Sequence, residues 1–235
     1  MTTDDTLVTS DNHALLLIDH QYLQLLAVRS HSNDTIVNNT VMLAKGAKIF
    51  GVPTLFTTAF AERQDLIKQI QAVHPDHVPI DRTSLNSWDD ERVRDWVQAT
   101  AKKKLVMAGL WTEVCLTMPV LSAIAAGHEV YMVTDASGGG SVEGHERAVQ
   151  RMMQAGARAS AHRRLLCQRA PARLGPDGDG RRRRQSVRRV GWRIRTGAPL
   201  GVAVAGSQRR HSLSPAARQG SRPLPVALAR STSSG

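Results

Sequence analysis

The stretch from residue 104 to residue 126 limits the possible folds of this chain more than any other. An apolar run ends at Gly109, the chain turns, and a helical pattern begins at Glu113 with Cys115 in its first turn. This pattern predicts a strand, a tight turn and a helix with a thiol at its N-terminus. The unpaired N–H groups and the positive dipole end of a helix start favour thiolate over thiol, so Cys115 is a candidate nucleophile. The alternative is an inert thiol, because cysteine is among the most buried residue types.

Short apolar segments alternate with helical patterns along the rest of the first 160 residues. Predicted strands lie at residues 14–18, 53–58, 78–80, 105–110 and 129–134, and predicted helices at residues 35–50, 62–73, 91–102, 113–126 and 141–155. Strands that alternate with helices of this length indicate parallel βαβ units. We therefore expect a doubly wound, three-layer α/β/α fold with a mostly parallel, Rossmann-like sheet. In such sheets the functional residues collect at the carboxyl ends of the strands.

Three residues of different chemistry follow predicted strands, namely Asp19, Arg82 and Cys115. At one sheet edge, Asp19 could act as general base and then acid, and Cys115 could attack an electrophilic carbon. A cation beside both would stabilise the charged forms, and N–H groups of the turn could stabilise an oxyanion. The alternatives are that Asp19 only caps the next segment and that Arg82 is a solvated surface charge.

A family resemblance is carried by LLLIDHQ at residues 15–21, GVPTLFTT at 51–58, SLNSWDD at 84–90, AGLWTEVCLTMPVLSAIAAGHEVYMVTDASGG at 108–139 and RMMQAGA at 151–157. These segments resemble the isochorismatase-like cysteine hydrolases, most closely the YcaC-type subgroup. The resemblance covers roughly residues 10–157 and is most specific around Cys115. It implies an Asp, Lys, Cys triad in which Asp19 is the acid, Cys115 the nucleophile, and Arg82 lies near the lysine position. A guanidinium keeps its charge, so Arg82 could orient and stabilise but not relay a proton.

The same resemblance implies further features of the site. It implies a cis peptide between Leu110 and Trp111, and an oxyanion hole made by the backbone N–H groups of Trp111 and Cys115. Substrate-binding candidates are Phe60, Asn86 and Trp88, of which Trp88 is equally suited to the core. The implied function is hydrolysis of a small molecule at an amide C–N or related bond through a covalent cysteine intermediate.

We expect neither metal nor cofactor. The metal-binding branch of the family uses an Asp and paired His, and the sequence shows no such cluster; His20 is interpreted as a structural hydrogen-bonding residue.

Family members often form homo-oligomers. We expect no membrane partner and no specific nucleic acid. Two cysteines, an N-terminus without a signal peptide and the lack of a long apolar run favour a cytoplasmic protein.

The net charge of +11 is divided unevenly along the chain. Residues 1–160 hold 14 Lys and Arg against 18 Asp and Glu, a balance of −4, whereas residues 161–235 hold 17 Arg against 2 Asp, a balance of +15. We therefore expect a hydrolase domain at residues 1–160 and an Arg-rich, disordered tail at residues 161–235. One interpretation of the tail is a basic arm that binds RNA or DNA nonspecifically through RRRRQSVRR at residues 181–189.

A second interpretation of the tail is out-of-frame translation that begins near residues 157–161. With a shift of one base, the codons of residues 170–180 can encode ELQRDWARMET and those of residues 191–197 a peptide that begins GGAYG, both similar to the family's C-terminal segment. The sheet would then lose its last edge strand and the C-terminal helices, and the product would be catalytically impaired.

Overall fold

In the computed structural model, residues 7–169 are described, with side chains through residue 165. The chain divides into two compact units, Met1–Arg193 and Ile194–Gly235, and every described residue belongs to the first. The expectations of a basic arm, a frame change and disorder fall mostly on residues 170–235 and so lie outside the described residues. Within the described part, no helix combines the length and the apolar character needed to cross a membrane.

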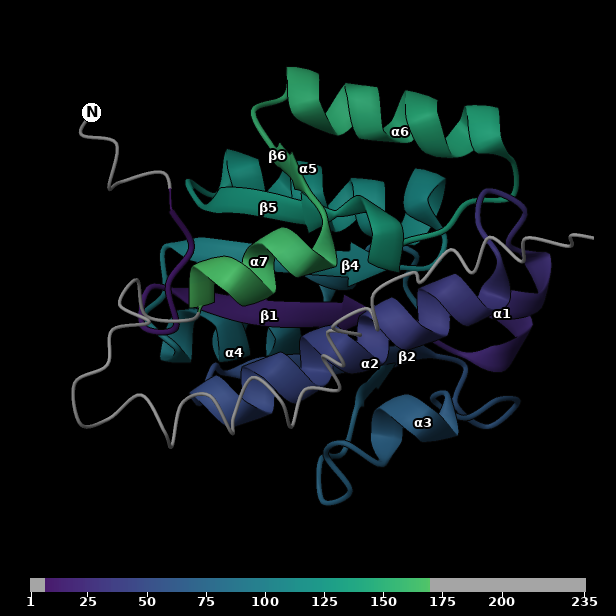
Figure 1. Cartoon of the computed structure of the whole chain (residues 1–235), viewed down its shortest axis with the longest axis horizontal. Helices are drawn as coiled ribbons and strands as arrows, with labels where there is room; N and C mark the ends of the chain where they lie inside the picture. The colour runs from purple at the N-terminus through teal and green to yellow at the C-terminus, as the bar shows by residue number, and fades with distance from the viewer. Residues whose placement is uncertain (1–6, 170–235) are drawn as a thin grey trace, which may run out of the picture. The chain divides into compact units, whose positions relative to one another are not determined.

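Six parallel strands form one sheet in the order β3-β2-β1-β4-β5-β6 (Figure 1). Their bounds are β1 His13–Ile18, β2 Thr54–Ala59, β3 Ile80–Arg82, β4 Lys104–Gly109, β5 Glu129–Val133 and β6 Arg158–Ser160. The central strand β1 pairs with β2 through Leu15 and Thr54, and with β4 through Leu15 and Val106. The direction of strand addition reverses between β1 and β4, which is where doubly wound sheets place their functional sites.

Helices cover both faces of the sheet, which confirms the predicted three-layer fold. Their bounds are α1 Tyr22–Ala27, α2 Asn33–Phe50, α3 Lys68–Gln71, α4 Glu91–Ala99, α5 Thr117–Ala125, α6 Val142–Gln154 and α7 His162–Arg169. Successive residues of a strand point to opposite faces. Leu15 and Leu17 of β1 accordingly pack in one cluster with residues of α1, α2, α3 and α7, whereas Leu16 and Ile18 pack in a second with residues of α4, α5 and α6.

Local signals in the sequence set the ends of the longer helices. Helix α2 begins after Ser32, whose hydroxyl accepts a hydrogen bond from the Thr35 N–H at 3.3 Å, and it ends at Gly51 with φ of +67°. The predicted helix at residues 62–73 is reduced to α3. Its first part forms a turn at residues 61–63 instead. The residues that follow lie beside Gln21, whose side chain donates to the Gln64 carbonyl at 2.9 Å and which bridges to Leu66.

The end of the sheet differs from the expectation. The prediction that the last edge strand is missing is wrong, because β6 pairs with β5 from Arg158 to Ser160. Helix α7 then packs against α2 and buries Leu165 completely, so ordered structure continues beyond residue 160. Strand pairing uses backbone groups, so three residues without an apolar pattern can form it. The domain boundary at residue 160 stays a prediction.

Candidate active site

Asp19 lies at the switch point of the sheet, directly after β1. Its backbone adopts φ of +54°, a left-handed conformation that turns the chain away from the strand, and its residue is fully buried. Thr57 of β2 donates a hydrogen bond to Asp19 Oδ1 at 2.8 Å. The other oxygen, Oδ2, forms an ion pair with Arg82 Nη2. Asp19 therefore does more than cap a segment.

Arg82 ends β3 and reaches across β2 to the carboxyl group of Asp19. It is 4% exposed, so it is a buried ion-pair partner and not a solvated surface charge. Its Nη1 donates to the Ser84 carbonyl, and its Nε has no hydrogen-bond partner among the described residues. Two bonds in different directions fix the guanidinium plane, and this plane in turn orients the carboxylate.

Cys115 follows β4 on a tight turn. The peptide bond from Leu110 to Trp111 is cis, and a π-helical turn, Thr112–Leu116, precedes α5. A Cβ at Gly109 would lie 3.0 Å from the Ile18 Cβ, so glycine allows the ends of β4 and β1 to approach closely. The thiol of Cys115, 6% exposed, consequently meets Asp19 in a side-chain hydrogen bond.

The thiol is not a ready thiolate in the resting site. Burial, together with the charge of Asp19, raises the pKa of Cys115 to about 11, although a backbone hydrogen bond from Trp111 and the charge of Arg82 act in the opposite direction. The expectation that the helix start favours the thiolate is therefore wrong for this state, because desolvation outweighs the local dipoles. A reaction at this sulfur would need a base to remove the proton.

Asp19 has the properties of that base. Burial raises its pKa above the ordinary 3.8, while Arg82, Thr57 and Cys115 oppose part of the shift. A carboxylate of raised pKa is a stronger proton acceptor than an exposed one. The site thus holds a protonated thiol against a buried carboxylate that is already oriented by a cation.

The predicted oxyanion and substrate groups lie in different environments. The backbone of Trp111 hydrogen-bonds to the thiol, so it is close to any atom that the sulfur attacks. Phe60 follows β2 with φ of +55° and is 41% exposed. The amide nitrogen of Asn86 donates to Asp89 and Ser122 at 2.9 and 3.2 Å. The side chain of Trp88 packs in the core cluster below α4, as the core alternative expected.

Two supporting residues were not singled out from the sequence. Thr57 and Ser137 are fully buried hydroxyl residues, and Ser137 Oγ accepts from the Gly109 N–H at 3.1 Å at the end of β4. A hydroxyl within an apolar strand, as in TLFTT, is the signal that could have identified Thr57. His20, by contrast, hydrogen-bonds to the Ala136 carbonyl at 2.9 Å, and burial lowers its pKa to about 4, which fits its structural interpretation.

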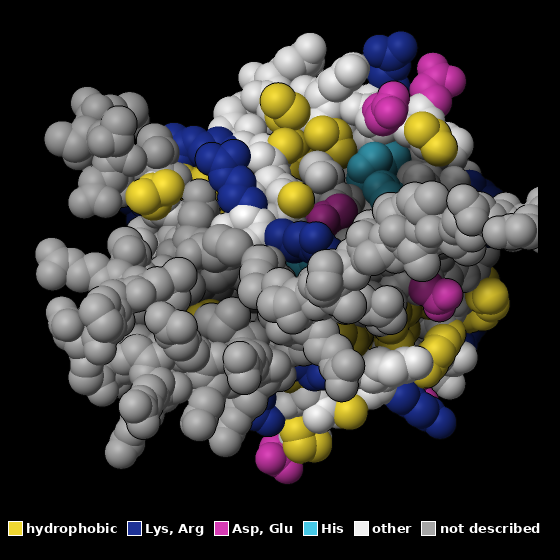
Figure 2. All heavy atoms as spheres, in the orientation of Figure 1, with side chains coloured by type: hydrophobic (Ala, Val, Ile, Leu, Met, Phe, Trp, Pro, Cys, Tyr) yellow, Lys and Arg dark blue, Asp and Glu magenta, His cyan; other side chains and the backbone are white. Residues whose placement is uncertain are grey.

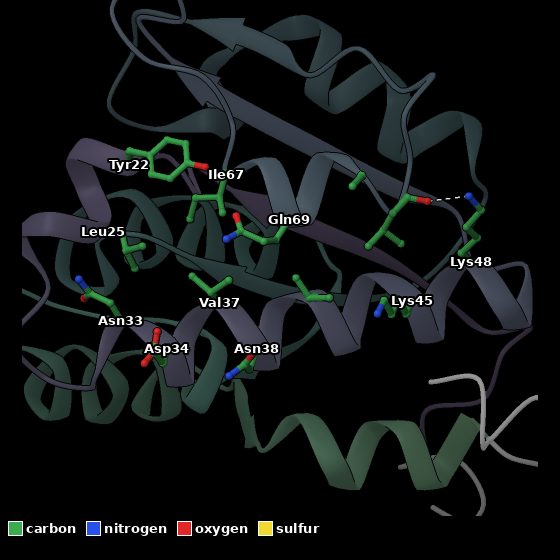
Figure 3. A pocket seen from close by; sticks show the side chains of 13 residues that line it. Tyr22, Leu25, Asn33, Asp34, Val37, Asn38, Lys45, Lys48, Ile67 and Gln69 are labelled. Carbon is green, nitrogen blue, oxygen red and sulfur yellow. Dashed lines mark hydrogen bonds between the residues drawn. The ribbon is translucent and has the colours of Figure 1, made fainter. Parts of the chain in front are cut away.

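Two pockets lie near these elements. One of about 710 Å³ is formed by α1, α2 and the segment around α3, with Lys45 and Lys48 at one end and Asp34 at the other (Figure 3). The other, of about 340 Å³, lies at the end of β3 and is lined by Arg82.

In Figure 2 the described hydrophobic side chains form small separate groups between charged ones. Among the described residues, no group of three or more His, Cys, Asp or Glu could hold a metal ion.

The sequence model of the isochorismatase domain matches residues 13–164 of this chain. The chain belongs to the isochorismatase family. The match continues past residue 157, where the sequence resemblance was expected to end, and includes β6 and the start of α7.

Relatives of this isochorismatase-family chain include hydrolases of the YcaC type. The chain is 38% identical to "Probable hydrolase YcaC" of Escherichia coli (strain K12) over 171 residues, which cover 72% of this chain and 82% of that protein. It is similar to the crystal structure of the Escherichia coli YcaC gene product, an octameric hydrolase of unknown specificity, with a TM-score of 0.72, 34% identity, and coverage of 79% and 89%. It is also similar to YcaC from Pseudomonas aeruginosa with hexane-2,5-diol and covalent acrylamide, with a TM-score of 0.70, 31% identity, and coverage of 79% and 98%.

Proposed function

We propose that this chain is a cysteine hydrolase that cleaves an amide C–N or related bond of a small molecule through a covalent intermediate on Cys115. One observation carries the proposal: the buried carboxyl group of Asp19 contacts both the Cys115 thiol and the Arg82 guanidinium. Nucleophile and base within hydrogen-bonding reach, with the base oriented by a third group, is the arrangement that nucleophilic catalysis requires.

The first half of the reaction would form a thioester. Asp19 accepts the thiol proton as the Cys115 sulfur attacks the carbonyl carbon, so an S–C bond forms and the carbonyl oxygen gains a negative charge. The backbone N–H groups of Trp111 and Cys115 are proposed to stabilise that oxyanion. Collapse of the intermediate breaks the C–N bond, and the leaving amine takes the proton from Asp19.

The second half would release the acid. Asp19, again a carboxylate, removes a proton from water, which attacks the thioester carbon and breaks its bond to the Cys115 sulfur. Asp19 then gives this proton to the displaced sulfur, which restores the thiol and the carboxylate. Arg82 acts only as a hydrogen-bond donor in both halves of the reaction, because a guanidinium has no acceptor atom. Its proposed role is to hold the Asp19 carboxylate toward the sulfur and to offset the negative charge.

The relatives support this proposal in two respects. The covalent acrylamide in the Pseudomonas aeruginosa protein means that a group of that protein reacts with an electrophilic small molecule. The Escherichia coli protein is an octamer, and on that basis we propose a homo-oligomer for this chain. Phe60, exposed after β2, and Asn86 remain the proposed substrate contacts, and no metal or cofactor enters the proposed steps.

Trapping of the acyl intermediate tests the proposal. The full chain is mixed with p-nitrophenyl acetate, a small activated ester, quenched in acid, and digested for peptide mass mapping. We expect an acetyl group on the peptide that contains Cys115, slower acetylation in Asp19→Asn, and none at this position in Cys115→Ala. Acetylation of Cys115 and Cys167 at the same slow rate, unchanged by Asp19→Asn, would rule out an activated nucleophile.

A further inference from the structure

The hydroxyl of Thr112 joins the nucleophile turn to helix α6. Thr112 is fully buried and lies between Trp111, whose backbone hydrogen-bonds to the thiol, and the rest of the turn that contains Cys115. Its Oγ1 lies 2.9 Å from His145 Nδ1, in a buried hydrogen bond between side chains that are 33 positions apart in the sequence. A buried bond of this kind restrains a backbone that local sequence alone does not fix.

Thr112 uses all of its polar groups in hydrogen bonds. Its N–H donates to the Gly138 carbonyl at 3.0 Å, and its carbonyl accepts from Thr117 Oγ1 at 2.6 Å. The bond to His145 is the third. Thr112 is therefore held by Gly138 in the loop before α6, by Thr117 at the start of α5 and by His145 of α6. Among these partners, only His145 bonds to the Thr112 side chain.

His145 is itself fixed in place. It is 7% exposed, and the ring of His31 contacts its ring edge-on at 4.8 Å between centroids. Burial lowers the pKa of His145, and His31 lowers it further, against the nearby charges of Glu113 and Glu146. A neutral imidazole has one donor and one acceptor nitrogen, so Nδ1 can complete the bond with the Thr112 hydroxyl in either direction.

A second hydrogen bond holds the neighbouring residue of the turn. The N–H of Gly140, in the loop before α6, donates to Glu113 Oε1 at 2.7 Å. Helix α6 packs against the same turn. Consecutive residues of the nucleophile turn, Thr112 and Glu113, are thus held by α6 and by the loop that leads into it.

We propose that His145 is a positioning residue for Cys115, which acts through its hydrogen bond to the Thr112 hydroxyl. This bond holds the start of the turn where the thiol meets both Asp19 and the Trp111 backbone. The inference rests on the proposed function, because positioning matters only if Cys115 reacts. His145 does not touch the reacting atoms, and its contribution is a narrower range of sulfur positions.

Substitutions at both ends of the bond test the proposal in the full chain. Thr112→Val keeps the shape and removes the hydroxyl, His145→Leu removes the ring nitrogens, and His145→Asn keeps a polar group near the position of Nδ1. The readout is the rate constant of iodoacetamide modification of Cys115, followed by peptide mass mapping with Cys167 as internal reference. Gln150→Ala, on the exposed side of α6, is the matched control.

We expect Thr112→Val and His145→Leu each to slow modification of Cys115 about tenfold, as small displacements of reacting groups do. The double variant should be no slower than the slower single variant, since both remove the same bond. His145→Asn should retain most of the modification rate that His145→Leu loses. Gln150→Ala should react as fast as the chain without substitutions. Thermal unfolding of each variant is recorded alongside.

The possible outcomes separate this inference from the proposed function. Slow reaction of Cys115 with iodoacetamide in the chain without substitutions overturns both this inference and the proposed function. Fast modification that Thr112→Val and His145→Leu leave unchanged, even where they lower the unfolding temperature, overturns the positioning role alone. Additive losses in the double variant would also overturn it. If His145→Leu does not fold, the isosteric Thr112→Val decides.

Discussion

The carboxyl group of Asp19 interacts with two groups that affect it in different ways. Arg82 stabilises its negative charge, whereas the Cys115 thiol offers a proton that this charge can accept. The charge of Asp19 also raises the pKa of the thiol, so at equilibrium it disfavours the thiolate. Asp19 would thus slow a reaction that needs free thiolate and speed one in which the proton leaves as the sulfur attacks.

The pH dependence of iodoacetamide modification distinguishes these roles. In the chain without substitutions, we expect the modification rate of Cys115 to rise as Asp19 ionises, at a pH above the ordinary 3.8. The rate should then hold level once Asp19 is ionised, and rise again toward the thiol pKa of about 11. In Asp19→Asn the level region should vanish. The remaining rise should move to lower pH, because the charge and hydrogen bond that raise the thiol pKa are gone. A level region that persists in Asp19→Asn would contradict the role of base.

At the scale of elements, β6 and α7 are attached to the sheet by polar contacts. Arg158 donates to Glu129 at 2.9 Å and to the Tyr131 hydroxyl at 2.6 Å. Asp135, after β5, accepts from the His162 N–H at 2.9 Å and contacts His162 Nδ1 at 2.6 Å. The carboxylate therefore caps the N-terminus of α7 from outside the helix.

Asp135→Asn should loosen this end of the sheet. Burial would raise the pKa of Asp135, but the hydrogen bonds from His162 outweigh it and hold the pKa below 3.8. The lowered pKa means that the contact stabilises the fold above pH 3.8 and is lost as the pH falls through the folded-state value. We expect Asp135→Asn to cost about 1–3 kcal/mol at neutral pH. Hydrogen exchange should quicken in residues 158–169 and stay slow in β1, and equal quickening in both would contradict a local role.

The elements differ in how far the sequence predicts them. Apolar runs and caps such as Ser32 and Gly51 identify β1, β2, β4, β5 and α2, and their alternation gives the confirmed fold class. The sequence of β6, Arg-Ala-Ser, has no apolar pattern that would predict a strand. Its position depends on backbone pairing with β5. The site was predicted as three strand-end residues, which the structure brings together. The protonated state of Cys115 was not predictable, because it depends on burial by residues distant in the sequence.

At the scale of the whole molecule, charge and fold belong to different parts of the sequence. The described helices and strands end at Arg169, whereas 14 of the 17 arginines after residue 160 follow it. A chain that ends after Arg169 therefore retains every described element and loses most of the positive charge.

Truncation after Arg169 should separate the reactivity of Cys115, which depends on the fold, from DNA binding, which depends on the positive charge. We expect the truncated chain to keep the Cys115 modification rate of the full chain. The full chain should bind duplex DNA nonspecifically, with an affinity that falls steeply as salt rises, and the truncated chain should not. DNA binding by both chains, measured by filter retention across a salt series, would show that the arginines are not responsible for it.

The strand order has a consequence for synthesis of the protein. Strand β1 is made early, yet its neighbours are β2 on one side and β4, from Lys104 to Gly109, on the other. A chain that leaves the ribosome from its N-terminus exposes one edge of β1, and with it Asp19, until β4 has emerged. Pairing over such separations is slow. The Asp19 carboxylate thus has no Cys115 thiol beside it until 96 further residues, from 20 to 115, have been made. During this period a chaperone that covers exposed strand edges would have its clearest target.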